Sequence, residues 1–327
     1  MSGPFSSALG PAIADYLALK RALGRDYRTD GWVLGHFDAF LAAHAATVVT
    51  PEVYTSWCLS LRHLAPNTRR TRMWIVRKLC LYLRRRDRAC FVPDTSSFPA
   101  ACAPRRPHIF TEEEIARILR AASELRPRST SPLCGPMYRL ALVLLYTAGL
   151  RRGELVRLVL SDYDPVEHTL LVRASKFHKS RLVALSPDAA REVDAYLQLR
   201  RALHHSDDAP LLVSNCRGLR ARSGAGLGGG LRRLFVRAGV RTASGQPPRV
   251  HDLRHTYAVH VLLRWYRAGV NAQAKLPILT ASMGHVSVAS TAHYLTLLDA
   301  VTEAASDLFA RHCGKVLSCL RQEGGGR

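Results

Sequence analysis

The sequence predicts a mainly α-helical chain with a small β-sheet, divided into a helical N-terminal domain and a second domain of the α+β class. The first hundred residues carry apolar side chains at three- and four-residue spacing, which is the helical period. Residues 89–110 contain four prolines and break this period. The rest of the chain adds three short strand-like runs between further helical stretches, so we expect one small sheet within a helical domain.

Four helices account for the N-terminal domain, which we place at residues 1–100, followed by a linker at residues 101–110. The expected helical ranges are 11–24, 30–46, 52–64 and 67–87. Gly24, Pro51 and Pro66 fall at the boundaries, where glycine and proline end one helix or open the next. The apolar spacing in each range predicts that the helices share one core.

The fourth predicted helix is strongly basic. Met73, Val76, Cys80 and Leu83 form an apolar stripe, and cations cover the other faces with only Asp87 to offset them. A solvated helix usually mixes both signs of charge, so a face of one sign favours contact with phosphate. The predicted DNA-binding cations are Arg69, Arg70, Arg72, Arg77, Lys78, Arg84, Arg85 and Arg86.

The whole chain has the same excess of positive charge. Its 47 lysines and arginines exceed its 25 aspartates and glutamates, which gives a net charge of +22. Such a field attracts a polyanion, and nucleic acid is the commonest one. An arginine-rich genome is the alternative source of this composition, but the one-signed fourth helix favours nucleic acid.

Composition argues against a membrane, secreted or metal-binding protein. The most apolar stretch, residues 140–150, is too short to span a bilayer, and the first residues lack the pattern of a signal peptide. The eight cysteines are scattered without a CxxC pair, as in a reduced cytoplasmic protein. We expect no metal site and no disulfide framework.

The second domain is placed at residues 111–315, with residues 316–327 as a disordered tail. Thr111 followed by Glu114 predicts a capping box at its first helix, and a second helix is expected at about residues 135–148. Strands are expected at Thr169–Arg173, Arg181–Leu185 and Pro210–Ser214. The glycine-rich stretch at residues 223–235 matches no nucleotide-binding motif and is interpreted as a flexible loop before a helix.

Polar side chains gather in the sequence His251-Asp252-Leu253-Arg254-His255. In a helix His251, Arg254 and His255 share one face, which suits an anion better than a core. His251 and His255 also have the spacing of a metal pair, but no glutamate lies between them and no third ligand is evident.

Three further motifs add to this one. In the stretch at residues 146–158, Gly149 allows a close turn, and Glu154 lies three residues after Arg151, close enough to orient its guanidinium. Lys176 and Lys179 lie between two strand-like runs, so a lysine is expected at a hairpin tip. His285 precedes a tyrosine, Tyr294, by nine residues.

The ordered set GLRxxEL, a hairpin lysine, HxLRH and GH followed nine residues later by tyrosine resembles the tyrosine recombinases, or phage integrase family. The resemblance covers residues 108 to 312, and the basic N-terminal part is similar to that family's core-binding domain. The segment between Arg254 and Tyr294 is longer than in many members of this family. This longer variant resembles a branch of the family that is found on mobile elements. The resemblance implies a DNA breaking and rejoining enzyme without cofactor or ATP, acting through a 3′-phosphotyrosyl intermediate.

The resemblance also implies a role for each motif residue, and these roles fit local chemistry. The nucleophile would be Tyr294, and Arg151 and Arg254 would hold the phosphate oxygens. His251 would accept the tyrosine proton, and Lys176 would protonate the leaving 5′-oxygen. A hydrogen bond from His285 to the phosphate and an orienting role for Glu154 complete the set.

Several alternatives stay open from the sequence. Arg152 competes with Arg151, Lys179 with Lys176, and Tyr257 and Tyr266 with Tyr294. A type IB topoisomerase uses similar chemistry, and a non-catalytic DNA-binding accessory protein could retain the fold. The helix expected after Tyr294 packs on its own domain or, as the family suggests, on a neighbouring protomer.

The partners that the resemblance implies are double-stranded DNA and further copies of the chain. A homotetramer would bridge two paired DNA sites, while the free protein would be a monomer or weak oligomer. Sister recombinases could take part, and no membrane is involved. We expect a bacterial cytoplasmic, nucleoid-associated protein.

Overall fold

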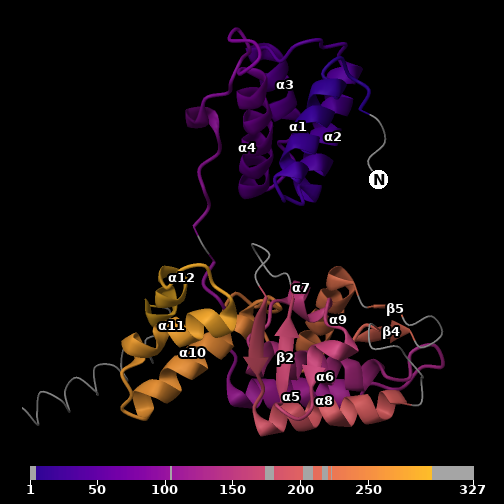
Figure 1. Ribbon diagram of the computed structural model, residues 1–327, viewed down its shortest axis with the longest axis vertical. Coiled ribbons are helices and arrows are strands. Elements are labelled where there is room, and N and C mark those ends of the chain that lie inside the picture. The colour runs from indigo at the N-terminus through magenta and orange to yellow at the C-terminus, as the bar shows by residue number, and fades with distance from the viewer. Residues whose placement is uncertain are drawn as a thin grey trace, which may run out of the picture. The chain divides into compact units, whose positions relative to one another are not determined.

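The computed structural model describes residues 5–103, 105–173, 180–201, 209–215, 220–221 and 223–296. Lys176, Lys179, the helix expected after Tyr294 and the tail at 316–327 lie outside these described residues. The structure is mostly helical with a small three-stranded antiparallel sheet, so the predicted fold class is confirmed. The chain divides into two compact units, Met1–Arg105 and Arg106–Arg327, and the colour of Figure 1 runs continuously through both by residue number.

Four helices build the first unit. They are α1 (Gly10–Ala22), α2 (Arg28–Ala43), α3 (Pro51–Ser60) and α4 (Pro66–Leu83), with a short 3₁₀ turn η1 (Thr95–Ser97) after them. Pro51 and Pro66 open their helices because a missing N–H costs nothing in the first turn. The side chains of Leu34, Phe37 and Leu79 are fully buried in the shared core.

The second unit contains eight α-helices among its described residues. They are α5 (Glu112–Ser123), α6 (Cys134–Thr147), α7 (Arg152–Leu155), α8 (Pro187–Arg200), α9 (Gly224–Arg237), α10 (Asp252–Arg267) and α11 (Ala272–Met283), followed by a single turn, α12 (Ala289–Ala292), and the 3₁₀ helix η5 (His293–Thr296). The expected capping box is present, since Thr111 and Glu114 exchange hydrogen bonds at the start of α5. Apolar residues on almost every side of α6, including Leu140, Leu142 and Leu144, make it the central buried helix.

A small sheet flanks these helices. Strands β1 (Tyr163–Asp164), β2 (Thr169–Val172) and β3 (Arg181–Ala184) are antiparallel in sequence order after a 3₁₀ turn, η2 (Leu160–Asp162). The expected β2 and β3 are confirmed within one residue, whereas the third expected strand is the shorter β4 (Val213–Asn215), paired with β5 (Arg220–Ala221). Because α11 packs against β3, the start of β3 at Arg181 lies beside the end of α11.

The interpretation of the glycine-rich stretch as a flexible loop before a helix was wrong, because the stretch itself forms most of α9. A Cβ on Gly230 would lie 1.8 Å from the Tyr138 hydroxyl, and one on Gly228 would lie 2.6 Å from the Arg152 guanidinium. These glycines therefore allow α9 to pack closely on its neighbours. Burial of Leu227 and Leu231 compensates for the low helix propensity of glycine.

Helices α10, α11 and α12 gather at one end of the second unit, as Figure 1 shows in orange and yellow. Their shared apolar cluster includes Val259, Leu262, Leu279 and Tyr294. Within the described part of the chain, no helix combines the length and the apolar character that crossing a membrane requires.

Candidate active site

Arg254 is the most deeply buried charge of the site, with 1% of its surface exposed. It lies in the first turn of α10 and donates hydrogen bonds to two backbone carbonyls, Gly149 O and Met283 O, each at 2.5 Å. Burial lowers its pKa to about 10, so the guanidinium stays charged at neutral pH. Two carbonyls from distant segments thus fix the direction in which the remaining N–H groups point.

A left-handed turn at Gly149 makes one of these contacts possible. Its φ is +60°, and a Cβ there would lie 2.3 Å from the Tyr257 ring. Any other residue would be strained in this backbone region and would collide with that ring. The expected close turn is therefore present, and it orients the Gly149 carbonyl toward Arg254.

Arg151 follows this turn and is held by its own helical neighbour. Its backbone N–H and Nη1 donate to the two carboxylate oxygens of Glu154, at 2.9 and 2.7 Å, and Nη2 donates to Gly284 O at 2.8 Å. A quarter of its side chain remains exposed, unlike Arg254. Arg151 therefore offers a fixed guanidinium with an open edge. The neighbouring Arg152 lies against α9 at Gly228 instead.

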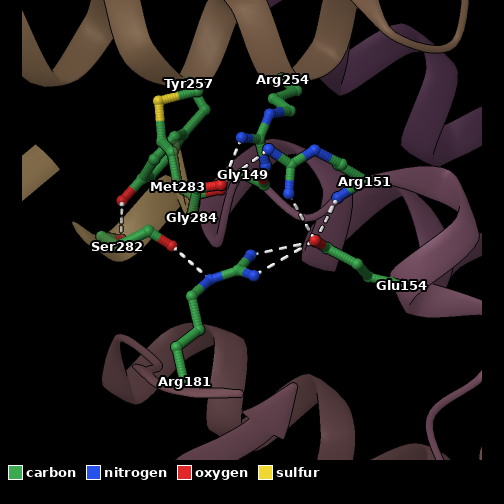
Figure 2. A network of polar contacts seen from close by, with 9 residues as sticks. All are labelled: Gly149, Arg151, Glu154, Arg181, Arg254, Tyr257, Ser282, Met283 and Gly284. Carbon is green, nitrogen blue, oxygen red and sulfur yellow. Dashed lines mark hydrogen bonds and ion pairs between the residues drawn. The ribbon is translucent and has the colours of Figure 1, made fainter. Parts of the chain in front are cut away.

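The C-terminus of α11 collects three arginines. The carbonyls of Ser282, Met283 and Gly284 accept hydrogen bonds from Arg181, Arg254 and Arg151, respectively (Figure 2). The last carbonyls of a helix lack intrahelical partners and carry partial negative charge, so they attract guanidinium groups. Three segments far apart in sequence are joined at this point.

Glu154 is the carboxylate within this cluster, and it is 3% exposed. It accepts two hydrogen bonds from Arg151 and two from Arg181, as the dashed lines of Figure 2 show. Burial alone would raise the pKa of Glu154, but the hydrogen bonds and charges of Arg181 and Arg151 lower it to about 2. The carboxylate is thus ionised and fully hydrogen-bonded.

Tyr294 lies in η5 with 3% of its surface exposed. Its hydroxyl is 3.1 Å from Nδ1 of His255, and its ring stacks on that of His285 at 6.1 Å between centroids. Burial raises the pKa of Tyr294, while the positive charges of Arg254 and Arg151 lower it. The net result is a raised pKa, so the two guanidinium groups offset only part of the effect of burial and the phenol keeps its proton at neutral pH.

Two histidines, His255 and His285, contact the ring of Tyr294, and His251 packs against His255; each of the three has a lowered pKa. Burial, followed by neighbouring positive charge, lowers the pKa of His255 and of His285 to about 4. The pKa of His251 is also lowered by burial and by Arg254, although part of its ring reaches solvent. All three are neutral at pH 7, so each has a lone pair that can accept a proton.

A row of hydroxyl groups positions His285. Its Nδ1 is 2.8 Å from the hydroxyl of Thr291, which in turn lies 2.8 Å from the hydroxyl of Thr280. Both threonines are buried, so the ring is held by groups shielded from water. The other ring nitrogen is left for contact with a bound ligand.

A groove of about 690 Å³ lies beside this cluster. Its basic wall is formed by Arg151, Arg152, Arg232, Arg249 and His251. Gly228 and Gly229 of α9 also line the groove. The groove therefore has the positive charge that a phosphate backbone needs.

The structure brings six of the predicted site residues into one cluster: Arg151, Glu154, His251, Arg254, His285 and Tyr294. Sequence reasoning gave no role to Arg181. It placed His255 on the anion-binding face with His251 and Arg254, and also as a possible metal partner of His251, but did not include it among the catalytic residues. Nothing local in the sequence marks Arg181. Among the described residues, no group of three or more His, Cys, Asp or Glu side chains could hold a metal ion.

The predicted DNA-binding cations of α4 fall into two groups. Contacts inside the first unit are made by Arg70, Arg72, Arg77, Lys78 and Arg86. Arg70 and Arg77, for example, donate to the carbonyls of Pro99 and Pro93 and tie down the segment that follows α4. Arg69 is half-buried within the helix, whereas Arg84 and Arg85 are exposed just after its end.

The lowered histidine pKa values predict a pH-dependent stability of the second unit. Below about pH 6.5 the unfolded chain binds protons at His255 and His285, whereas the folded chain binds them only near pH 4. The contribution of these two histidines to the free energy of unfolding is therefore fully present above about pH 6.5 and is lost as the pH falls toward 4. Between pH 7 and 5 we expect a loss of about 2 kcal/mol, after allowance for solvent screening.

Native-state hydrogen exchange of α10 and α11 would measure this loss, at pH values above the range in which Glu154 titrates. His255→Asn should reduce the pH dependence because one titrating ring is removed. An unchanged slope in that variant would contradict the assignment.

Comparison with known proteins indicates the same family as the sequence motifs of the site. Residues 108–300 match the family described as phage integrase. The chain is 33% identical over 297 residues to the integrase/recombinase y4rB of Sinorhizobium fredii, covering 89% of this chain and 93% of that one. It is 30% identical over 188 residues to the tyrosine recombinase XerA of Pyrococcus horikoshii, covering 58% and 56% of the two chains.

Solved structures show that the fold is shared. The Tn1549 transposon integrase in complex with transposon right end DNA matches with a TM-score of 0.64 and 16% identity, over 92% of this chain and 98% of that one. The site-specific recombinase XerH bound to a palindromic difH substrate matches with a TM-score of 0.63 and 16% identity, over 86% and 79%. The ordered motifs, the fold and these sequence matches together show that the chain belongs to the phage integrase family, the DNA breaking and rejoining tyrosine recombinases.

Proposed function

We propose that this site-specific DNA recombinase cuts and rejoins double-stranded DNA by transesterification, with Tyr294 as the nucleophile. The observation that carries the proposal is the convergence of Tyr294 with two fixed guanidinium groups, Arg151 and Arg254. A phosphodiester under attack gains negative charge on its non-bridging oxygens, and planar guanidinium forks suit those oxygens.

The proposed reaction exchanges one phosphodiester bond for another. The Tyr294 oxygen attacks phosphorus, the bond to the 5′-oxygen breaks, and a 3′-phosphotyrosyl enzyme and a free 5′-hydroxyl remain. A 5′-hydroxyl from the partner strand then attacks the same phosphorus and releases the tyrosine. Bond energy is kept throughout, so the reaction needs no ATP.

Two proton transfers accompany each exchange. A neutral histidine accepts the tyrosine proton, and both His251 and His255 lie next to Arg254 in the first turns of α10. Negative charge on a bound phosphate would raise their low pKa values and make them stronger bases. Lys176, outside the described residues, would protonate the leaving 5′-oxygen, as the family resemblance implies.

We further propose that the enzyme acts as a homotetramer bridging two DNA sites, within the bacterial cytoplasm and on nucleoid DNA. Relatives with the same fold have been captured on DNA, including the integrase of a transposon. The match to that integrase favours a role on a mobile element, with integration or transposition as the biological task.

A nicked suicide substrate tests the proposal. Cleavage next to a nick releases a short fragment, so the covalent protein–DNA adduct accumulates and survives denaturation. We expect an adduct on a 3′-phosphate and a 5′-hydroxyl that can be labelled. Joining of two different duplexes supports recombination, relaxation of plasmid by a monomer would indicate a topoisomerase, and binding without adduct would indicate an accessory protein.

The exposed cations at the end of α4 give a separate prediction. Arg84→Gln with Arg85→Gln should weaken binding to all DNA sequences and reduce the slope of log K against log salt by about two, roughly one per lost phosphate contact. Arg70→Gln is the matched control, because that guanidinium donates to Pro99 O. An unchanged salt slope in the double variant would exclude these two arginines from the DNA interface.

A further inference from the structure

Arg181 makes as many contacts in the site as either of the predicted arginines. It opens β3, and its side chain is 11% exposed. Nη1 and Nη2 donate to the two oxygens of Glu154 at 3.1 and 2.9 Å, and Nε donates to Ser282 O at 2.8 Å. Figure 2 shows its guanidinium facing Glu154 across the end of α11.

The position of Gly284 shows how closely Arg181 is enclosed. A Cβ there would lie 2.7 Å from Nη1 and 3.0 Å from Cζ of Arg181, so the guanidinium lies against the bare Cα of the residue before His285. The Gly284 backbone is left-handed, with φ +65°, which also favours glycine. Arg181 therefore packs directly against the turn at Gly284 that precedes His285.

Charge balance gives this contact a chemical meaning. Glu154 has two guanidinium partners, Arg151 and Arg181, and its single negative charge can compensate only one of them. If Arg181 were absent, Arg151 would be the one remaining ion-pair partner of Glu154 among the residues that the structure describes. The carboxylate would then cancel the charge that Arg151 should present to the phosphate.

We propose that Arg181 is a positioning residue that compensates the charge of Glu154 and so leaves the positive charge of Arg151 available to the DNA phosphate. This inference rests on the proposed function. It gives Glu154 the task of orienting Arg151 without neutralising it, and it makes β3 an indirect part of the site.

The test compares single-turnover formation of the covalent adduct in two variants. Arg181→Gln should slow cleavage about a hundredfold, at the lower end of the effect of removing an electrostatic donor, while DNA affinity changes little. The double variant Arg181→Gln with Glu154→Gln should recover at least tenfold of that loss, because removing both charges restores the balance. A purely structural role would make the double variant slower still.

A matched control is available on the same hairpin. Arg173 pairs with Asp162, a carboxylate that is 4% exposed but lies outside the site. Arg173→Gln should leave the cleavage rate within about twofold, because the Arg173 side chain is 56% exposed and pairs with a carboxylate outside the arginine cluster. Equal losses in Arg173→Gln and Arg181→Gln would overturn the inference.

Arg181→Lys guards against a folding defect, because lysine keeps the charge but loses the fork. We expect its cleavage rate to lie at least tenfold above that of Arg181→Gln, and equal rates would overturn the inference. An adduct in the wild type together with a normal rate in Arg181→Gln would overturn this inference alone. Absence of an adduct in the wild type would instead overturn the proposed function.

Discussion

Replacing Tyr294 by phenylalanine should abolish the covalent protein–DNA adduct and leave DNA affinity within about twofold. The change removes only the hydroxyl that we assign as the nucleophile, and no cation that faces phosphate is lost. The ring would keep its place in the apolar cluster of α10 and α11. His255 would lose its partner at Nδ1, which costs about 1–3 kcal/mol of stability.

Tyr257→Phe provides the matched control for this experiment. Tyr257 packs in the same cluster, and its hydroxyl lies 3.2 Å from Ser282 Oγ, beside the site. It was also an alternative nucleophile from the sequence. We expect Tyr257→Phe to form the adduct at a rate within a few-fold of the wild type. An adduct that persists in Tyr294→Phe and disappears in Tyr257→Phe would reassign the nucleophile.

Replacing Arg254 by glutamine should slow adduct formation about a thousandfold, which is the upper range for losing one preorganised electrostatic donor. The loss should lie in the cleavage step, because a buried guanidinium contributes most as negative charge develops on the phosphate. Arg254→Lys should remain severely impaired, since an ammonium group cannot bond two carbonyls and the phosphate in the fixed geometry of the fork.

Stability must be measured in parallel, because Gly149 O and Met283 O lose their guanidinium partner in either variant. Arg264→Gln is the control, since Arg264 lies on the same helix and is exposed. It should leave both cleavage and stability nearly unchanged. If the slower cleavage of Arg254→Gln is fully explained by weaker DNA binding, Arg254 does not act on the transition state.

Local signals in the sequence were sufficient for most of the helices. The prolines at 51 and 66 and the pair Thr111 and Glu114 marked true helix starts, because caps and N-terminal prolines act within one turn of the chain. The glycine-rich start of α9, in contrast, was wrongly predicted to be a loop. Glycine is a poor helix former in isolation, but here close packing against Tyr138 requires its missing side chain.

The sequence by itself determined the family and the set of residues that carry its motifs, because each motif is a short pattern whose order along the chain is distinctive. Only the tertiary structure decided which groups hold those residues in place. The holding contacts join segments up to 133 residues apart in the chain. They are made by Arg181, His255 and the carbonyls of Ser282, Met283 and Gly284. Every residue has a backbone carbonyl, so a sequence motif cannot predict which carbonyl will accept a hydrogen bond from a guanidinium group. The choice depends on where the C-terminus of α11 lies in the folded protein.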